Sequence, residues 1–247
     1  MKNKVNTLLK FLLPICFWIS IWEILALIVN HSYFLPSVSD TFSALFTVIT
    51  STSFFKVVFF TFLRVISGLV LGIIFGVLLA LLSNRFTIIE TLISPIIAVI
   101  KSTPVATFII IFWVMLGGEM LSVFIAFLMV MPIIWQNLMD AFKSIDKNLS
   151  EVCDVFEFSF AKRMKILIFP ALLKYFIPAV ITATGLAWKS EIAAEIIAYT
   201  KNSIGQYIND AKYGFDTATV FAWTLIVITL SIVLENITKY LLRRVKL

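Results

Sequence analysis

The chain has few of the side chains with which enzymes carry out chemistry. Its 247 residues include two cysteines and one histidine, and only 14% of them are charged. Cys16 lies in an apolar run and Cys153 in a charged segment, a pair that predicts neither a disulfide framework nor a metal site. His31 is the sole histidine and lies in a predicted loop, which excludes a Ser/His/Asp catalytic set. We therefore expect each cysteine to have a structural or neutral role and His31 to be simply solvated.

A phosphate-binding loop is also missing. The pattern G-x-x-x-x-G-K-[ST] does not occur, and no glycine is followed by lysine, which excludes ATP hydrolysis by the P-loop mechanism. The net charge of +6 does not indicate nucleic-acid binding, because the cations cluster at the two termini and in one internal loop, as they do when they set membrane topology. We predict that the chain is not an enzyme and uses no cofactor of its own.

Apolar residues, by contrast, make up 61% of the chain, against about half in soluble domains. One compact core cannot bury so much apolar surface, so the bilayer is its expected solvent. A membrane-crossing helix needs roughly 20 mostly apolar residues, and six segments qualify. We predict an all-α membrane protein in which residues 1–247 form a single transmembrane domain. The predicted spans are about residues 8–29, 55–82, 89–116 (broken near Pro104), 121–142, 171–199 and 218–241.

The positive charges predict how these spans are oriented. The first apolar stretch is too long for a signal peptide and contains Trp18, Trp22 and Glu23, so we interpret it as a retained span. With the N-terminus inside, thirteen Lys and Arg residues of the connections and termini lie in the cytoplasm and three outside. This bias predicts a multi-pass protein of the cell membrane with both termini cytoplasmic. The inside set is Lys2, Lys4, Lys10, Arg85, Lys143, Lys147, Lys162, Arg163, Lys165, Lys239, Arg243, Arg244 and Lys246, and the outside set is Lys56, Lys201 and Lys212.

The segments between the spans also carry predictions. In the external segment 31–54, Ser39 or Asp40 is expected to cap a short interfacial helix. Segment 200–217 is polar and glycine-containing, which favours a loop or a short lid. In the second span, small residues recur every four positions, and we expect this stripe to be a helix-packing seam. Its members are Gly68, Gly72 and Gly76, followed by Ala80.

The cytoplasmic segment 143–169 is too structured for a linker. Ser150 can cap a helix whose first turn holds Glu151 and Asp154, which are favourable at a helix N-terminus. The apolar side chains that follow exceed what a short solvated helix needs, and an exposed apolar patch usually marks a protein contact. We therefore predict a docking helix for a cytoplasmic partner. The alternative is a loop that lies on the membrane. The apolar residues are Val152, Val155, Phe156, Phe158 and Phe160.

Charged residues inside the spans are candidates for the translocation path, because such groups are costly in a membrane and usually face a cavity or a partner. Glu191 and Glu195 share a helix face, so water, a proton or a cation is needed between them. Arg64 or Lys101 is a better partner for them than Lys189. At the helix break, Lys101 precedes hydroxyls and freed backbone groups that suit an anion. The alternative is that these charges are interhelical pairs that fix packing. The complete candidate set is Arg64, Lys101, Ser102, Thr103, Trp188, Lys189, Glu191 and Glu195, with packing favoured for Trp188.

The cytoplasmic segment resembles the motif of ABC importer permeases, which reads Glu-Ala-Ala, then Gly, then an aliphatic run ending in Pro. Glu151-Val152-Cys153 occupies the first three places, Pro170 stands 19 residues after Glu151, and Glu157 replaces the glycine. Further stretches resemble the same family in order along nearly the whole chain. They are Leu35-Pro36-Ser37-Val38-Ser39, Arg64-Val65 with the glycine stripe, Pro104, Trp113 and Gly117, and Gly185-Leu186-Ala187-Trp188 followed by Ala193-Ala194-Glu195.

This resemblance implies a type I importer permease fold, with six transmembrane helices and a cytoplasmic coupling helix. It implies a homodimer, two ATPase subunits that bind ATP and Mg²⁺, and an external binding protein that delivers substrate. The most similar branch transports sulfonates, taurine, nitrate and bicarbonate, which predicts a small anionic solute, and it includes importers of thiamine-pyrimidine precursors. A stand-alone secondary transporter is the alternative from another class. The implied coupling residues are Glu151, Val152, Cys153, Val155, Phe156, Glu157 and Pro170.

Overall fold

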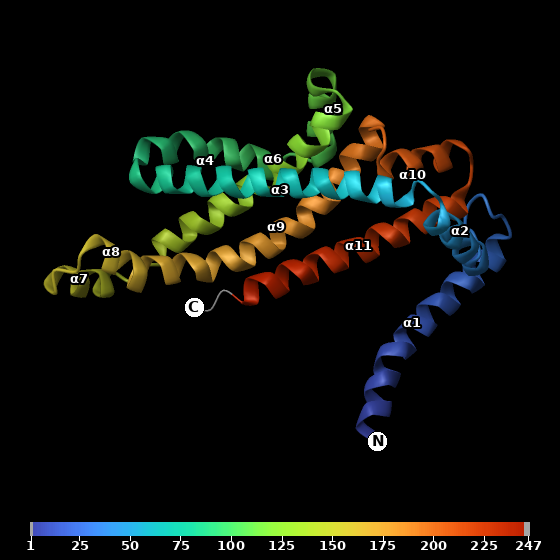
Figure 1. The fold of residues 1–247 in the computed structure, drawn as a ribbon, viewed down its shortest axis with the longest axis horizontal. Coiled ribbons are helices and arrows are strands. Elements are labelled where there is room, and N and C mark those ends of the chain that lie inside the picture. Colours follow the sequence, from blue (N-terminus) through green and yellow to red (C-terminus); the bar gives the residue numbers. More distant parts are fainter. Residues whose placement is uncertain (1, 245–247) are drawn as a thin grey trace.

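The computed structural model describes the backbone of residues 2–244 and the side chains of residues 12–244, so residues 8–11 of the first predicted span are described by their backbone alone. All elements within this range are helical (Figure 1). They are α1 (Lys2–Val29), α2 (Val38–Thr50), α3 (Phe54–Arg85), α4 (Thr87–Ser102), α5 (Val105–Leu116), α6 (Gly118–Lys143), α7 (Lys147–Val155), α8 (Phe160–Arg163), the π-helical segment η1 (Met164–Ile168), α9 (Phe169–Ala198), α10 (Ile204–Tyr213) and α11 (Thr217–Arg243).

Five helices of the described chain are long and apolar enough to cross a membrane, and a sixth crossing is reached only by counting α4 and α5 together. These two helices meet at an angle of 106°, so α5 stands away from the direction of α4 (Figure 1). The break predicted near Pro104 is therefore confirmed, and the predicted count of six spans is met when the bent pair is one span. Thr103 is extended, as proline disfavours the helical conformation of the preceding residue, and Pro104 has no N–H with which to continue α4.

The centre of the bundle is formed by α3, α6 and α9, with α6 packed against both of the others. The glycine stripe of α3 faces α6. A methyl group added to Gly72 would lie 2.5 Å from Cβ of Val130, closer than two carbon atoms can approach. The two backbones therefore pack at a distance that only glycine permits on this face. The same holds for Gly68 against Ala126 and for Gly76 against Ile134.

The N-terminus of α2 is held by a residue of α1. Ser37, not Ser39 or Asp40, is the capping residue, and its hydroxyl accepts a hydrogen bond from the Asp40 N–H. The free N–H of Val38 donates to the Glu23 carboxylate at 2.8 Å, an arrangement favourable to an acidic group at a helix N-terminus. Glu23 is thus explained by structure and needs no role in transport.

The segment expected to be a loop or short lid forms the helix α10. Ser203 begins it by accepting a hydrogen bond from the Gln206 N–H, and Gly214 follows its last residue. The helix packs on α9 and α11. The prediction failed because the polar composition of this segment masked a regular capping signal.

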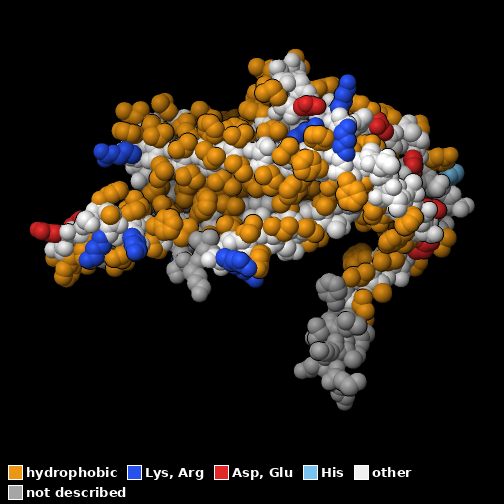
Figure 2. Space-filling view, in the orientation of Figure 1, with side chains coloured by type: hydrophobic (Ala, Val, Ile, Leu, Met, Phe, Trp, Pro, Cys, Tyr) orange, Lys and Arg blue, Asp and Glu red, His pale blue; other side chains and the backbone are white. Residues whose placement is uncertain are grey.

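Helix α1 extends away from the bundle (Figure 1). Only 6% of its apolar window, Leu12–Val29, is buried within the chain. On the face seen in Figure 2, hydrophobic side chains cover most of the molecule, so lipid or another protein must cover these surfaces.

Candidate functional site

The segment between α6 and α9 folds into a compact helical unit, which we call the α7–α8 unit (residues 144–163). Its first helix begins earlier than expected, because Asp146 rather than Ser150 is the cap and accepts a hydrogen bond from the Asn148 N–H. The guanidinium of Arg163 pairs with Asp154 at 2.7 Å and donates to the hydroxyl of Ser150. These two contacts attach α8 to α7.

The turn after α7 is made without the glycine that this position favours. Glu157 has a φ of +49°, in the left-handed region that a non-glycine residue rarely adopts. The Phe158 N–H donates to the Cys153 carbonyl and the Glu157 N–H to the Asp154 carbonyl, which is the Schellman arrangement of a helix C-terminus. A sharp turn is therefore present here, although Glu157 replaces the glycine of the motif.

Replacing Glu157 with glycine should stabilise the protein by up to about 1 kcal/mol, because glycine adopts this conformation without the steric cost of a Cβ. The gain is to be measured as a shift in SDS-induced unfolding in mixed micelles. Glu151→Gly, in the middle of α7, is the matched control and should destabilise by about 1 kcal/mol. Destabilisation by Glu157→Gly would contradict the assignment of the turn.

The α7–α8 unit presents apolar side chains outward. Val155 and Phe156 are 79% and 69% exposed, and Val152 and Glu151 are also exposed. Cys153 differs from its neighbours in the motif, since its side chain is buried. It serves the packing of α7 and does not belong to the exposed surface.

Pro170 lies in the first turn of α9, and the chain stays helical through it from Phe160 onward. The π-helical segment η1 precedes it. Proline removes one backbone hydrogen bond and crowds the preceding turn, and the wider π-helical turn accommodates both effects.

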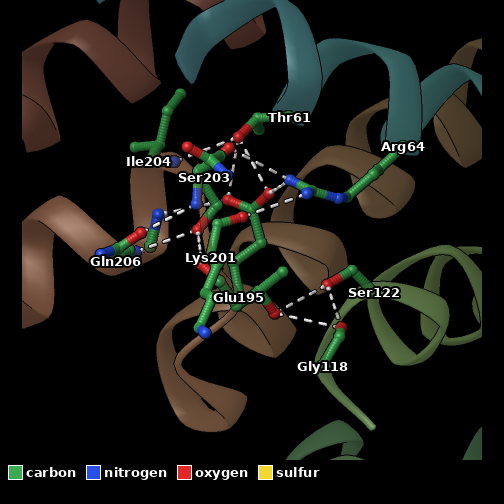
Figure 3. Close-up of polar contacts among 12 residues, drawn as sticks. Thr61, Arg64, Gly118, Ser122, Glu195, Lys201, Ser203, Ile204 and Gln206 are labelled. Carbon is green, nitrogen blue, oxygen red and sulfur yellow. Dashed lines mark hydrogen bonds and ion pairs between the residues drawn. The ribbon is translucent and has the colours of Figure 1, made fainter. Parts of the chain in front are cut away.

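At the other end of α9, Glu195 is the centre of a polar cluster (Figure 3). Its carboxylate is fully buried and pairs with Arg64 of α3 at 3.1 Å. The hydroxyl of Thr61 donates to it at 2.9 Å, and the Gly205 N–H at 3.2 Å. A buried carboxylate is tolerated when it is paired and hydrogen-bonded in this way.

The same cluster fixes the chain between α9 and α10. The second guanidinium nitrogen of Arg64 donates to the Lys201 carbonyl at 3.2 Å, and the Ile204 N–H donates to the Thr61 hydroxyl at 3.1 Å. A Cβ on Gly205 would lie 2.4 Å from Cβ of Glu195, so this residue must be glycine. The cluster thus joins α3, α9 and α10.

Arg64 also faces an open groove of about 640 Å³ along α3 and α6. Its polar groups come from Arg64, Ser67, Glu119 and Asn202. The rest of the wall is hydrophobic. Burying the charges of Arg64 and Glu119 against lipid would be costly. The hydrophobic lining residues are Phe60, Leu63, Leu71, Phe75, Met120, Val123, Phe124 and Phe127.

Comparison with known proteins decides between the classes of function. The family model described as "binding-protein-dependent transport system inner membrane component" matches residues 68–247. The chain belongs to this family. It is therefore a permease subunit of an ABC importer, and the ATPase of such a transporter is a separate subunit.

Two related proteins support the same family, and one solved structure supports the same fold. The permease is 25% identical over 249 residues to a protein of Methanocaldococcus jannaschii named as an ABC transporter permease, covering 96% of this chain and 92% of that one. It is 25% identical over 111 residues to the Bacillus subtilis protein SsuC, named as an aliphatic sulfonates transport permease, covering 45% and 40%. Its fold matches the crystal structure of an amino acid ABC transporter with histidines, with a TM-score of 0.60, 15% identity and coverage of 77% and 91%. The fold is that of a type I importer permease.

The residues predicted to line the path do not form one site. Arg64 faces the groove, whereas Glu191 and Glu195 lie buried behind it, outside the groove lining. Trp188 is in the core, 1% exposed, and its indole N–H donates to the Val227 carbonyl of α11. Trp188 therefore packs helices together. Lys189 is exposed on another face of α9.

The helix break contributes less than expected to an anion site in this conformation. Lys101 and Ser102 are exposed at the end of α4. The hydroxyls of Ser102 and Thr103 both donate to the Val99 carbonyl, at 3.1 and 2.7 Å. Their protons are thus used within the helix, and none of the three residues reaches the groove.

Sequence reasoning missed several members of the cluster and groove. Three of them are polar residues that stand next to the end of a predicted span or inside an apolar run: Thr61, Glu119 and Asn202. At such positions the sequence does not show which residues they contact. Gly205 lay in a segment interpreted as a loop, in which glycine is common. Its close approach to Glu195 is a long-range contact that the sequence does not display.

Proposed function

We propose that two copies of this permease form the membrane channel of the importer, and that a small anionic solute passes along the groove beside Arg64. The observation that carries this proposal is the groove itself, which is open in a single chain and holds charged groups that lipid cannot satisfy. A second copy placed against it would close it into a channel.

The α7–α8 unit is the proposed contact for the ATPase. Its exposed Val152, Val155 and Phe156 supply apolar surface, and exposed Glu151 supplies a charge for a basic partner. Glu157 makes the turn between the two helices of the unit, and Pro170 follows the unit in the first turn of α9. The Lys and Arg distribution, thirteen against three, supports a cytoplasmic location for this unit and for both termini. An external binding protein would then meet the α2–α10 end.

The class of solute is proposed from two observations. Arg64 is the cation of the groove wall, and guanidinium groups bind carboxylates, sulfonates and phosphates through two parallel hydrogen bonds. The relative SsuC is named for aliphatic sulfonates. A sulfonate-like anion is therefore the first candidate. A thiamine-pyrimidine precursor or another small metabolite is the alternative within the same architecture, favoured by the carboxylate of Glu119 in the same wall.

The role of Arg64 is testable by transport kinetics. Arg64→Ala alone would leave Glu195 unpaired, so the informative variant is Arg64→Ala combined with Glu195→Gln, compared with Glu195→Gln alone. In proteoliposomes that contain the ATPase and the binding protein, we expect the double variant to lower solute uptake at least tenfold relative to its control, since a charge-assisted contact to an anion contributes about 1.5–3 kcal/mol. Equal uptake by the two variants would refute the assignment.

A further inference from the structure

Two carboxyl groups meet behind the groove with different surroundings. Glu191 and Glu195 are one turn apart on α9, and both are fully buried. Glu195 accepts hydrogen bonds from Thr61, Arg64 and Gly205. Among the described residues, no donor reaches either oxygen of Glu191, and the Glu195 carboxyl, which shares its face of α9, is itself an acceptor. Two acceptors thus face each other.

A buried, ionised carboxylate without a hydrogen-bond donor is strongly unfavourable. A proton on Glu191 removes that cost in two ways. It neutralises the group, and it provides an O–H that donates to Glu195. The geometry points to a proton-binding site in which Glu191 and Glu195 share one proton, leaving a single negative charge that Arg64 balances.

Within the described part of the chain, Arg64 is the cation paired with this carboxyl cluster. The lysines nearest in sequence, Lys189, Lys201 and Lys212, are exposed and form no ion pair with it. Helix α5 has no ionisable residue, and those of α6 are confined to its two ends. On α10, Asp210 accepts a hydrogen bond from the Tyr199 hydroxyl, and on α11, Glu235 is paired with Lys239. With both carboxyl groups ionised and one guanidinium, the cluster would therefore carry a net charge of −1. One further positive charge is needed, and one proton supplies it.

A metal cation fits this place poorly. The described residues contain no group of three or more His, Cys, Asp or Glu side chains that could hold one. The guanidinium of Arg64, 3.1 Å from Glu195, would repel a cation bound beside that carboxylate. A proton requires only the two oxygens that are present.

Protonation of this pair should also affect transport, an inference that rests on the proposed function. Arg64 belongs both to the cluster and to the groove wall, so a solute anion competes with Glu195 for its guanidinium. Loss of the proton adds a second negative charge next to Glu195 and strengthens its hold on Arg64. Lower pH should therefore favour solute binding in the groove, and higher pH should weaken it.

The proton itself can be detected without any partner or solute. Purified full-length protein in lipid nanodiscs should show, by infrared spectroscopy at neutral pH, the C=O stretch of a protonated carboxylic acid in a dry environment. Glu191→Gln should abolish this band, while its amide still donates to Glu195 and preserves the fold. Glu90→Gln, which alters a carboxylate already paired with Lys143, is the control and should leave the band unchanged.

Absence of such a band in the wild-type protein, or its persistence in Glu191→Gln, would overturn the proposal. If Glu191→Gln does not fold, the wild-type band alone decides, because it must disappear on titration to alkaline pH. Stabilisation of the wild-type protein by Na⁺ but not by choline, together with two ionised carboxylates, would indicate a cation site and would equally overturn it. Failure of the anion proposal leaves all these spectra unaffected, so the two ideas fail separately.

Discussion

Replacing Glu195 with alanine is expected to lower the free energy of unfolding by about 3–5 kcal/mol, the cost of breaking a buried ion pair from one side. The Arg64 side chain is only 11% exposed and would lose its carboxylate. The Thr61 hydroxyl and the Gly205 N–H would lose their acceptor at the same time. The measurement is SDS-induced unfolding of the purified protein in mixed micelles, followed by circular dichroism.

A matched control uses the pair between Lys143 and Glu90, whose side chains are 65% and 31% exposed. Breaking it with Lys143→Ala should cost about 0–1 kcal/mol, as exposed pairs do. If Glu195→Ala were no more harmful than Lys143→Ala, the Glu195 cluster would not hold α3, α9 and α10 together. Glu195→Gln should fall between the two, because its amide oxygen still accepts hydrogen bonds.

Reversing the charge of Glu151 should abolish substrate-stimulated ATP hydrolysis in the assembled transporter while leaving the permease folded. The side chain is exposed on α7, so its removal does not disturb the core. A lysine there would repel the basic ATPase residue that we propose as its partner, and like charges in contact cost several kcal/mol at an interface. The measurement is ATPase activity of the reconstituted complex with and without the solute-loaded binding protein.

Two further variants make this test specific. Glu151→Gln removes the charge without reversing it and should reduce the stimulation only in part. Lys165→Glu makes a charge change of equal size in the neighbouring segment η1, where the side chain is also exposed, and should retain the stimulation. Full stimulation in Glu151→Lys would show that α7 does not transmit the signal through this residue.

The helices of the bundle were predictable because each of them carries its own signal. Length and apolar composition located α3, α6, α9 and α11 to within a few residues, and the four-residue repeat of glycine in α3 indicated a seam before its partner α6 was known. What the sequence could not supply is the angle at Pro104. A proline predicts a break, but packing of α5 against α6 and α9 sets the bend of 106°.

The candidate site was predictable only in part, for a related reason. Arg64 and Glu195 were recognised as costly charges in a membrane, and their pairing across 131 positions of sequence was one of two options that remained open. Whether such a residue lines a path or lies behind it depends on rotation about the helix axis. On α3 that rotation turns Arg64 toward the groove, and on α9 it turns Glu191 away from it.

The α7–α8 unit shows the limits of motif matching in the same way. The spacing of Glu151 and Pro170 identified the segment, yet Cys153 at the third place of the motif turned out to be buried. Glu157 keeps the turn that glycine would make, because the Schellman hydrogen bonds hold the backbone in the left-handed conformation.

The central claim, that the groove beside Arg64 is the solute path, is tested most directly by thiol labelling of Ser67→Cys. Ser67 lines the groove, and the native cysteines are removed by Cys16→Ser and Cys153→Ala. The control is Val70→Cys, on the same helix but outside the groove lining. We predict that a membrane-impermeant maleimide labels Ser67→Cys in the ATP-trapped transporter, that solute protects it, and that labelling blocks uptake. Equal labelling of both positions, with uptake preserved after modification of Ser67→Cys, would contradict the account.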